Sequence, residues 1–176
     1  ENTTVTGSVI GGIDGGNIQA IRNNIEIDVS SNSVHIGNNS KITGSVTGGT
    51  GGKTASFNEV YIGNNVQIGH EIYYGNGSEI ITGGSTAAKA DFISTEASSN
   101  VVHIGDDVAV SMIYGGSAHA PFSSKNIVNN NCVTIGDRSN TFFVMAGNGW
   151  ENSTVTKNTL TVGNDAKMGF AYGARS

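Results

Sequence analysis

Short runs of alternating apolar and polar residues recur along the chain. Five segments share the frame Asn-x-Val-x-Ile-Gly-Asn/Asp-x with conservative changes. They begin at Asn32, Asn58, Asn100, Asn131 and Asn158. In the first of them Val34 and Ile36 alternate with Ser33 and His35. A period of two indicates a β-strand with one buried face, so the pattern predicts five equivalent short strands.

Two further runs complete the repeat. A second apolar block, in most copies ending in glycine, follows each frame at 42–49, 68–75, 110–116, 141–147 and 168–174, and residues 5–12 match 42–49. A third, weaker run lies at 24–29, 78–82, 126–128 and 153–156. Each repeat unit is therefore expected to hold three short strands and three turns.

The repeat starts are separated by 26, 42, 31 and 27 residues, and we place the variation after the second block. One unit cannot bury its apolar face alone, whereas stacked units share a continuous core. The pattern predicts an all-β parallel β-helix (β-solenoid), right-handed as most parallel connections are, with about five to six rungs. An antiparallel sandwich gives no reason for one frame to recur five times.

Stacking in register predicts columns of equivalent side chains. One interior column is expected to hold Val34, Val60, Val102, Val133 and Leu160, and the next Ile36, Ile62, Ile104, Ile135 and Val162. The asparagines that open the frames are expected to form a structural ladder, each amide donating to one neighbour and accepting from the other. These are Asn32, Asn58, Asn100, Asn131 and Asn158. The glycines of the frame are predicted to supply a bend with positive φ. These are Gly37, Gly63, Gly105, Gly136 and Gly163.

Composition narrows the classes of function. The 176 residues fit one domain, residues 1–176, and glycine is abundant at 26 residues. The net charge of −5 without a basic run argues against nucleic acid, and no apolar stretch is long enough for membrane insertion. The single Cys132 excludes an internal disulfide framework. Because the chain begins and ends inside repeats, we interpret it as one β-solenoid segment of a longer repetitive protein.

The frame Asn-x-Val-x-Ile-Gly-Asn-Asn, followed by Ile-Thr-Gly-Ser-Val-x-Gly-Gly, resembles the repeats of autotransporter passenger domains of type V secretion. The resemblance implies a β-helical protein at the bacterial cell surface or outside the cell, with a parent anchored in the outer membrane. It also implies adhesion or virulence as the role, and a host-cell or bacterial surface protein or glycan as partner. We therefore expect a non-catalytic adhesin or rigid stalk.

Candidate binding residues fall in two columns and one loop. His35, Tyr61 and His103 are expected to face outward on equivalent strands. A second column holds the aromatic residues just before the glycine turns, interrupted by a methionine; it comprises Tyr73, Tyr114, Met145 and Tyr172. Such a column is either a carbohydrate platform or a packing ladder, and we favour packing. Trp150 is expected on a loop, whereas Phe57, Phe92, Phe122 and either Phe142 or Phe143 are expected to cap or line the interior.

The sequence offers little catalytic chemistry. Asp106, Asp107 and Asp137 could hold calcium, but Arg138 is adjacent and ordinary Asx turns account for them better, so no metal or cofactor is expected. Nucleophile-elbow, zinc-protease and phosphate-loop motifs are missing, which argues against an enzyme. The alternative is a carbohydrate-active β-helix, such as a polysaccharide lyase, glycosidase or tailspike. Its groove would be formed by the variable segments 83–99 and 116–125.

Overall fold

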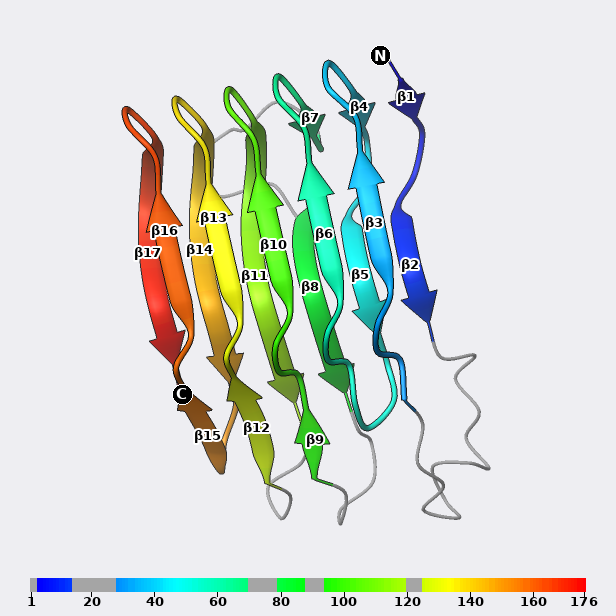
Figure 1. The fold of residues 1–176 in the computed structure, drawn as a ribbon, viewed down its shortest axis with the longest axis vertical. Helices are drawn as coiled ribbons and strands as arrows, with labels where there is room; N and C mark the ends of the chain where they lie inside the picture. The colour runs from blue at the N-terminus through cyan, green and yellow to red at the C-terminus, as the bar shows by residue number, and fades with distance from the viewer. Residues whose placement is uncertain (1–2, 14–27, 70–78, 88–93, 120–124) are drawn as a thin grey trace.

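The chain folds into parallel β-sheets. The computed structural model describes residues 3–13, 28–69, 79–87, 94–119 and 125–176, and these residues form strands and turns without a helix (Figure 1). The paired strands make sheets of nine, five and three members. The pairings within these sheets are all parallel. The prediction of an all-β fold with parallel strands is confirmed.

The five-stranded sheet is built from the recurring frame. Its strands are β3 (Ser33–Ile36), β6 (Glu59–Ile62), β10 (Val101–Ile104), β13 (Cys132–Ile135) and β16 (Thr159–Val162). They lie side by side in chain order, and the frame residues pair one to one. The identical hydrophobic pattern fixes this register, since a slip by one residue would turn every apolar side chain outward.

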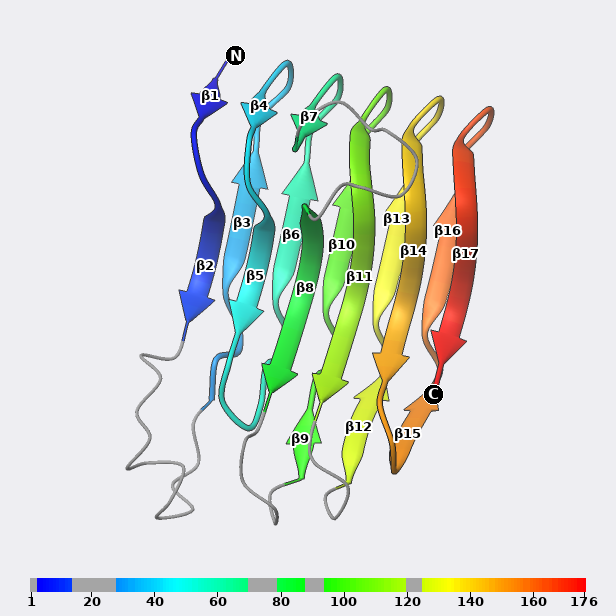
Figure 2. The same cartoon turned by 180° about the vertical axis from the view of Figure 1, so that it is seen from behind.

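The nine-stranded sheet contains the second block (Figure 2). Three strands of two residues lie along one part of it: β1 (Thr4–Val5), β4 (Lys41–Ile42) and β7 (Gln67–Ile68). The others are β2 (Val9–Ile13), β5 (Val46–Thr50), β8 (Ile80–Ala87), β11 (Ala109–His119), β14 (Asn140–Gly149) and β17 (Lys167–Arg175). The strand β11 is long enough to pair with both β7 and β8.

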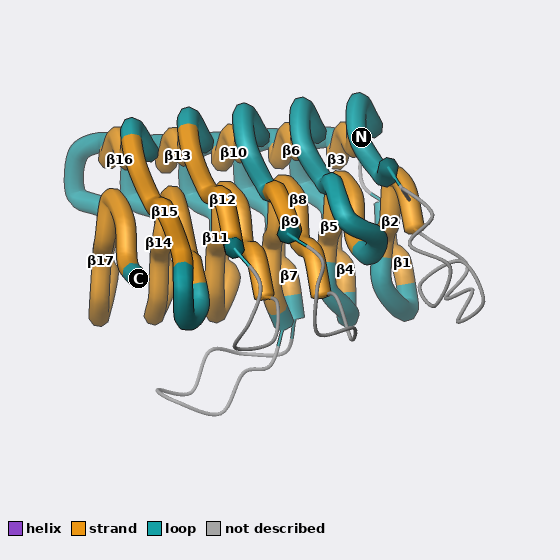
Figure 3. Tube along the Cα trace, turned by 90° about the horizontal axis from the view of Figure 1, so that it is seen from below, coloured by secondary structure: helices purple, strands orange, loops and turns teal. Residues whose placement is uncertain are grey.

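The third sheet is small. It consists of β9 (Thr95–Glu96), β12 (Asn126–Asn129) and β15 (Ser153–Thr156). Isolated bridges from Asp28 to Thr54 and from Thr54 to Glu96 extend the same alignment into the earlier repeats. Figure 3 shows the five-stranded and nine-stranded sheets as two rows of strands, joined by turns at their ends.

One predicted strand lies in a different sheet. The segment 78–82 was expected in the third run, but Ile81 pairs with Val46 on one side and with Ile113 on the other, inside the nine-stranded sheet. The prediction is wrong because 68–75 also has apolar residues followed by glycine and imitates the second block. Gly84 lies against Asn100, the asparagine of the next frame. Residues 70–78, which include Tyr73, lie outside the described part of the chain.

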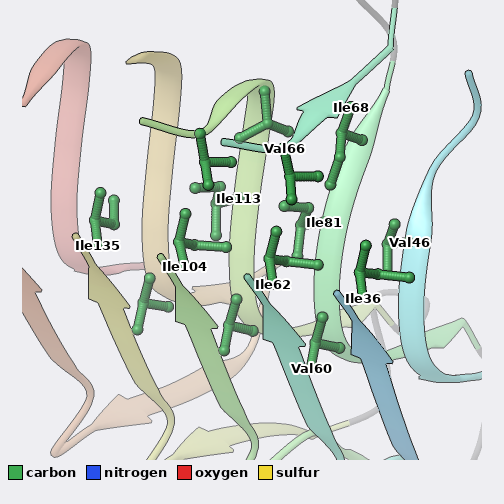
Figure 4. Close-up of a cluster of buried hydrophobic side chains, with 14 of the residues drawn as sticks. Ile36, Val46, Val60, Ile62, Val66, Ile68, Ile81, Ile104, Ile113 and Ile135 are labelled. Atoms are coloured by element: carbon green, nitrogen blue, oxygen red, sulfur yellow. The ribbon is translucent and has the colours of Figure 1, made fainter. Parts of the chain in front are cut away.

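The core lies between the five-stranded and nine-stranded sheets (Figure 4). Ile62 and Ile104 of the frame meet Ile81 and Ile113 of the second block, and all four side chains are fully buried. Full burial of each such side chain contributes about 1.5–3 kcal/mol. The interior column that contains Ile62 and Ile104 is less well buried in the last repeat. Val162, on the edge strand β16, is 39% exposed instead of interior as expected.

The predicted role of the frame glycines is wrong. None of the five has positive φ; the left-handed residues lie two positions later instead, at Asn39, Asn65, Asp107, Arg138 and Asp165. A Cβ atom on Gly63 or Gly105 would collide with the side-chain oxygen of Asn38 or Asn64 in the preceding repeat. Glycine is needed there because neighbouring turns approach closely, not because the backbone bends.

Candidate functional site

A ladder of asparagine side chains runs through the repeats. The Oδ1 atom of each later asparagine accepts two hydrogen bonds from the preceding one, from its backbone N–H and from its Nδ2. The first step joins Asn32 to Asn58 at 3.0 and 2.9 Å, and the next joins Asn58 to Asn100 at 3.0 and 3.1 Å. The ladder continues through Asn131 to Asn158. Because Asn58, Asn100 and Asn131 are buried, these hydrogen bonds satisfy polar groups that have no access to water.

Two further ladders hold the turns. The backbone N–H of Ser56 donates to Ser30 Oγ at 2.9 Å, and that of Ser98 donates to Ser56 Oγ at 3.0 Å. At the opposite end of the frame strands, Asn64 N donates to Asn38 Oδ1 at 2.8 Å, and Asp106 N donates to Asn64 Oδ1 at 3.0 Å. Both ladders run opposite to the asparagine ladder, since here the later repeat donates. Side chains thereby cross-link successive repeats at their corners.

The three aspartates belong to these turns. Asp106 Oδ1 accepts from Asp137 N at 2.9 Å, and Asp137 Oδ1 accepts from Asn164 N at 2.7 Å. Asp107 accepts from Arg138 at 2.8 and 2.7 Å in a two-pronged ion pair. The hydrogen bond from Arg138 lowers the pKa of the Asp107 carboxyl, and Asp107 in turn raises the pKa of Arg138. These carboxylates therefore stabilise turns, and within the described residues no cluster of His, Cys, Asp and Glu could hold a metal ion.

The first predicted column lies on the outer side of the five-stranded sheet. Tyr61 pairs with His35 and His103 on its two sides, and the three rings are stacked, with centroids 5.7 and 4.8 Å apart. Tyr61 is 41% exposed, so part of the stack is accessible to solvent. The column is short, because Thr134 and Thr161 continue it without a ring.

A larger group of rings covers the outer side of the nine-stranded sheet. We call Tyr114, Phe143, Phe170 and Tyr172 the aromatic face. Tyr114 and Tyr172 flank Met145 in register, as the sequence pattern placed them, but Met145 is buried, and the rings contact one another through Phe143. The ring centroids of Phe143 lie 6.1 Å from Tyr114, 6.2 Å from Phe170 and 5.8 Å from Tyr172.

Several aromatic predictions are corrected by this arrangement. Phe57 does not line the interior, since it is 67% exposed at a turn. Phe142 and Phe143 are only half-buried and do not belong to the core cluster. Phe92 and Phe122 lie outside the described residues. The aromatic face could have been found by aligning the second blocks, because Met112, Phe143 and Phe170 occupy one register position.

A shallow groove lies at one end of the aromatic face. Its lining includes Tyr114, Phe143, Trp150, Glu151 and Arg175. The indole of Trp150 is 53% exposed. It stacks on His119 with centroids 4.4 Å apart and an interplanar angle of 21°. The sequence indicated that Trp150 lies on a loop, but its stacking partner could not be read from the pattern because the two residues belong to different repeats.

The phenol of Tyr114 remains protonated at neutral pH. Burial raises the pKa of Tyr114, and the charge of Arg175 lowers it less. Among the described residues, the hydroxyl donates to Met112 Sδ at 3.9 Å, a weak contact. The groove therefore offers a neutral hydroxyl and a cation beside the apolar rings.

The two segments that were predicted to vary in length, 83–99 and 116–125, contain residues that belong to strands. Residues 83–87 belong to β8 and 95–96 to β9, while 117–119 belong to β11. Residues 88–93 and 120–124 of these segments lie outside the described residues. A groove between the two variable segments therefore stays a prediction.

A comparison of the chain with protein-family models, with curated proteins and with solved structures gave no significant match. In the described part of the chain, no helix is long and apolar enough to cross a membrane.

Proposed function

We propose that the chain is a segment of a parallel β-helix in which each repeat makes one turn, with right-handed connections as is usual for parallel strands. The proposal is supported by the spacing of the asparagine ladder, whose steps of 26, 42, 31 and 27 residues equal the repeat length. It is also supported by the way the frame and second block alternate between two sheets.

We infer that this segment is a non-catalytic scaffold of a secreted or cell-surface protein, of the kind that autotransporter passenger domains represent. Side-chain ladders at the corners and aliphatic columns between the sheets favour a stiff scaffold. The aspartates that the sequence offered for chemistry are engaged in turns, since Asp106 and Asp137 accept backbone N–H groups and Asp107 pairs with Arg138. A lyase or glycosidase is therefore the weaker candidate.

The observation that carries an adhesive role is the aromatic face. Surface patches of clustered rings commonly mark contact sites, because rigid aromatic side chains bury much area at little entropic cost. The face lies on hydrogen-bonded strands, so its rings are held in place before any partner arrives. We expect it to make the adhesive contacts of the scaffold with a host-cell or bacterial surface.

Two measurements test the proposed function. Small-angle scattering of the 176-residue chain is expected to give a flattened particle that is longest along the strands, since six neighbouring strands spaced by about 4.8 Å span only about 24 Å across the stack. Beads coated with the chain are expected to adhere to cells, and replacement of Tyr172 and Trp150 by alanine is expected to reduce that adhesion. The variant Tyr61→Ala, whose ring has similar exposure on the other sheet, is the matched control. The scattering of a spherical particle or of an unfolded chain would contradict the scaffold. Adhesion that does not change in the Tyr172 and Trp150 variants would contradict the role of the aromatic face.

A further inference from the structure

We propose that the aromatic face and the groove beside Trp150 bind a neutral, extended glycan that lies across β11, β14 and β17. This inference rests on the proposed function, because it names the ligand class of the surface assigned there to adhesion.

The ring geometry fits a chain of sugars. Tyr114, Phe143 and Tyr172 follow one another across three adjacent strands, with successive centroids 6.1 and 5.8 Å apart. These steps are close to the length of one sugar unit in an extended chain. Pyranose rings present C–H groups on their flat faces, and these pack on aromatic faces as other polarised C–H groups do. The platform therefore offers a contact for each of several consecutive units.

Trp150 extends the platform to the end of the groove. Its ring is braced from one side by His119, so the stacked pair holds the indole in a fixed orientation. The groove near Trp150 also contains Asn148, Glu151 and Arg175. Amide, carboxylate and guanidinium groups can donate to or accept from the hydroxyls of a sugar. A mainly apolar floor with a few polar groups is the usual composition of a small-molecule site.

Charge and shape favour a neutral glycan over other ligands. The net charge of −5 and the carboxylate of Glu151 oppose a polyanion, and Arg175 alone offsets them in the groove. A peptide strand would pair with the backbone edge of a sheet, not with its outer face. The ring planes are inclined to one another by 56° and 48°, so the row of rings, flanked by hydrogen-bonding groups, is a better fit to the faces and hydroxyls of a twisted sugar chain.

Affinity electrophoresis tests this inference with the 176-residue chain. Native gels contain galactomannan or hydroxyethylcellulose as neutral probes and alginate as the polyanionic probe. The wild type is expected to be retarded by at least one neutral polysaccharide and not by alginate. Trp150→Ala and Tyr172→Ala are each expected to weaken the retardation about tenfold, as the loss of one ring contact implies. Tyr61→Ala is expected to leave it unchanged, and circular dichroism checks that each variant keeps its fold.

Three results would overturn the inference: no retardation by either neutral probe, retardation only by alginate, or an equal loss in Tyr61→Ala. Should Tyr172→Ala fail to fold, Tyr172→Leu keeps an apolar side chain without the ring and is expected to show the same loss. Bead adhesion that still depends on Trp150 while neither neutral probe retards the chain would reject the glycan and retain the adhesive surface. Failure of the proposed function is recognised separately, by scattering that does not fit the flattened stack of parallel repeats.

Discussion

The side-chain oxygen of Asn131 accepts two hydrogen bonds from Asn100, one from its backbone N–H at 3.0 Å and one from its Nδ2 at 2.9 Å. Neither residue is accessible to water to any appreciable extent. One oxygen therefore satisfies two buried donors from a residue 31 positions away in the chain. Because the same relationship recurs at each step, the repeats are tied together by polar groups as well as by the aliphatic core.

The variant Asn100→Ala tests how much the asparagine ladder contributes to the stability of the fold. The change removes the oxygen that accepts from Asn58 N and Asn58 Nδ2 and leaves both donors buried without this partner. We expect a loss of about 3 kcal/mol in the free energy of unfolding, since an unsatisfied buried donor costs about 1–3 kcal/mol. Urea denaturation measures it. The exposed Asn140 provides the control, and Asn140→Ala is expected to change stability by no more than about 0.5 kcal/mol. Equal effects of the two changes would contradict the role of the ladder.

Glycine at position 84 is predicted to be required by its neighbours. A Cβ atom there would meet the carbonyl oxygen of Ala55 and lie 2.6 Å from Asn100 Oδ1. Both atoms belong to hydrogen-bonded, buried parts of adjacent repeats, so they cannot move aside freely. We expect Gly84→Ala to lower the melting temperature strongly. A Cβ on Gly37 meets nothing within 4 Å, so Gly37→Ala should be neutral or slightly stabilising. An unchanged melting temperature in Gly84→Ala would count against the close packing of the repeats.

Phe57 is expected to destabilise the fold, because its backbone has a left-handed conformation that another residue would tolerate better. Its φ is +57°, its side chain is exposed, and Asn130 holds the equivalent position before Asn131 in a later repeat. Left-handed backbone costs most residues about 1–2 kcal/mol, and asparagine tolerates it better. We expect Phe57→Asn to stabilise the fold by about 0.5–1 kcal/mol in urea titration. Phe57→Leu keeps the unfavourable backbone preference and should not raise the free energy of unfolding. An equal increase in Phe57→Leu would show that loss of the exposed ring, not relief of strain, stabilises the fold.

The ion pair of Asp107 and Arg138 predicts a small acid-dependent term in stability. The pKa of Asp107 is lowered from its ordinary value of 3.8, chiefly by the hydrogen bond from Arg138. Its contribution is therefore present above pH 3.8 and disappears as the pH falls through the lowered pKa. Because both side chains are well exposed, we expect a modest effect, screened by about 1 M salt. Melting temperatures of the wild type and Arg138→Gln should converge at low pH; a difference that persists there would show that Arg138 acts in another way.

The five frame strands could be predicted because one apolar pattern recurs and allows a single register, with Val60 and Val102 facing the same core. The position of the second block in the second repeat could not be predicted. Both Ile68–Gly75 and Ile80–Gly84 fit the pattern, and the choice depends on which glycine lies against Asn100. That contact joins β8 to the residue that precedes β10 in the next repeat, so local periodicity does not reveal it.

The glycines of the frame show a second limit. Sequence identifies where Gly105 recurs, but a turn conformation and a close approach both select glycine. Only the position of Asn64 in the preceding repeat distinguishes them. Alignment of the second blocks gives the positions of the aromatic face but not its contacts, because Tyr114 contacts Phe143 diagonally, whereas the alignment links Tyr114 with Met145.

The central claim is that equivalent strands of successive repeats lie parallel and in register, and the native Cys132 allows a direct test. Val101, 41% exposed on β10, is the residue paired with Cys132 on β13. Glu59 is paired with the far side of Val101, one strand further away. The variant Val101→Cys is treated with dibromobimane, which becomes fluorescent when it bridges two thiols within one molecule. Intramolecular bridging in Val101→Cys but not in Glu59→Cys is the predicted result, whereas no bridging in Val101→Cys, or equal bridging in both variants, would contradict the account.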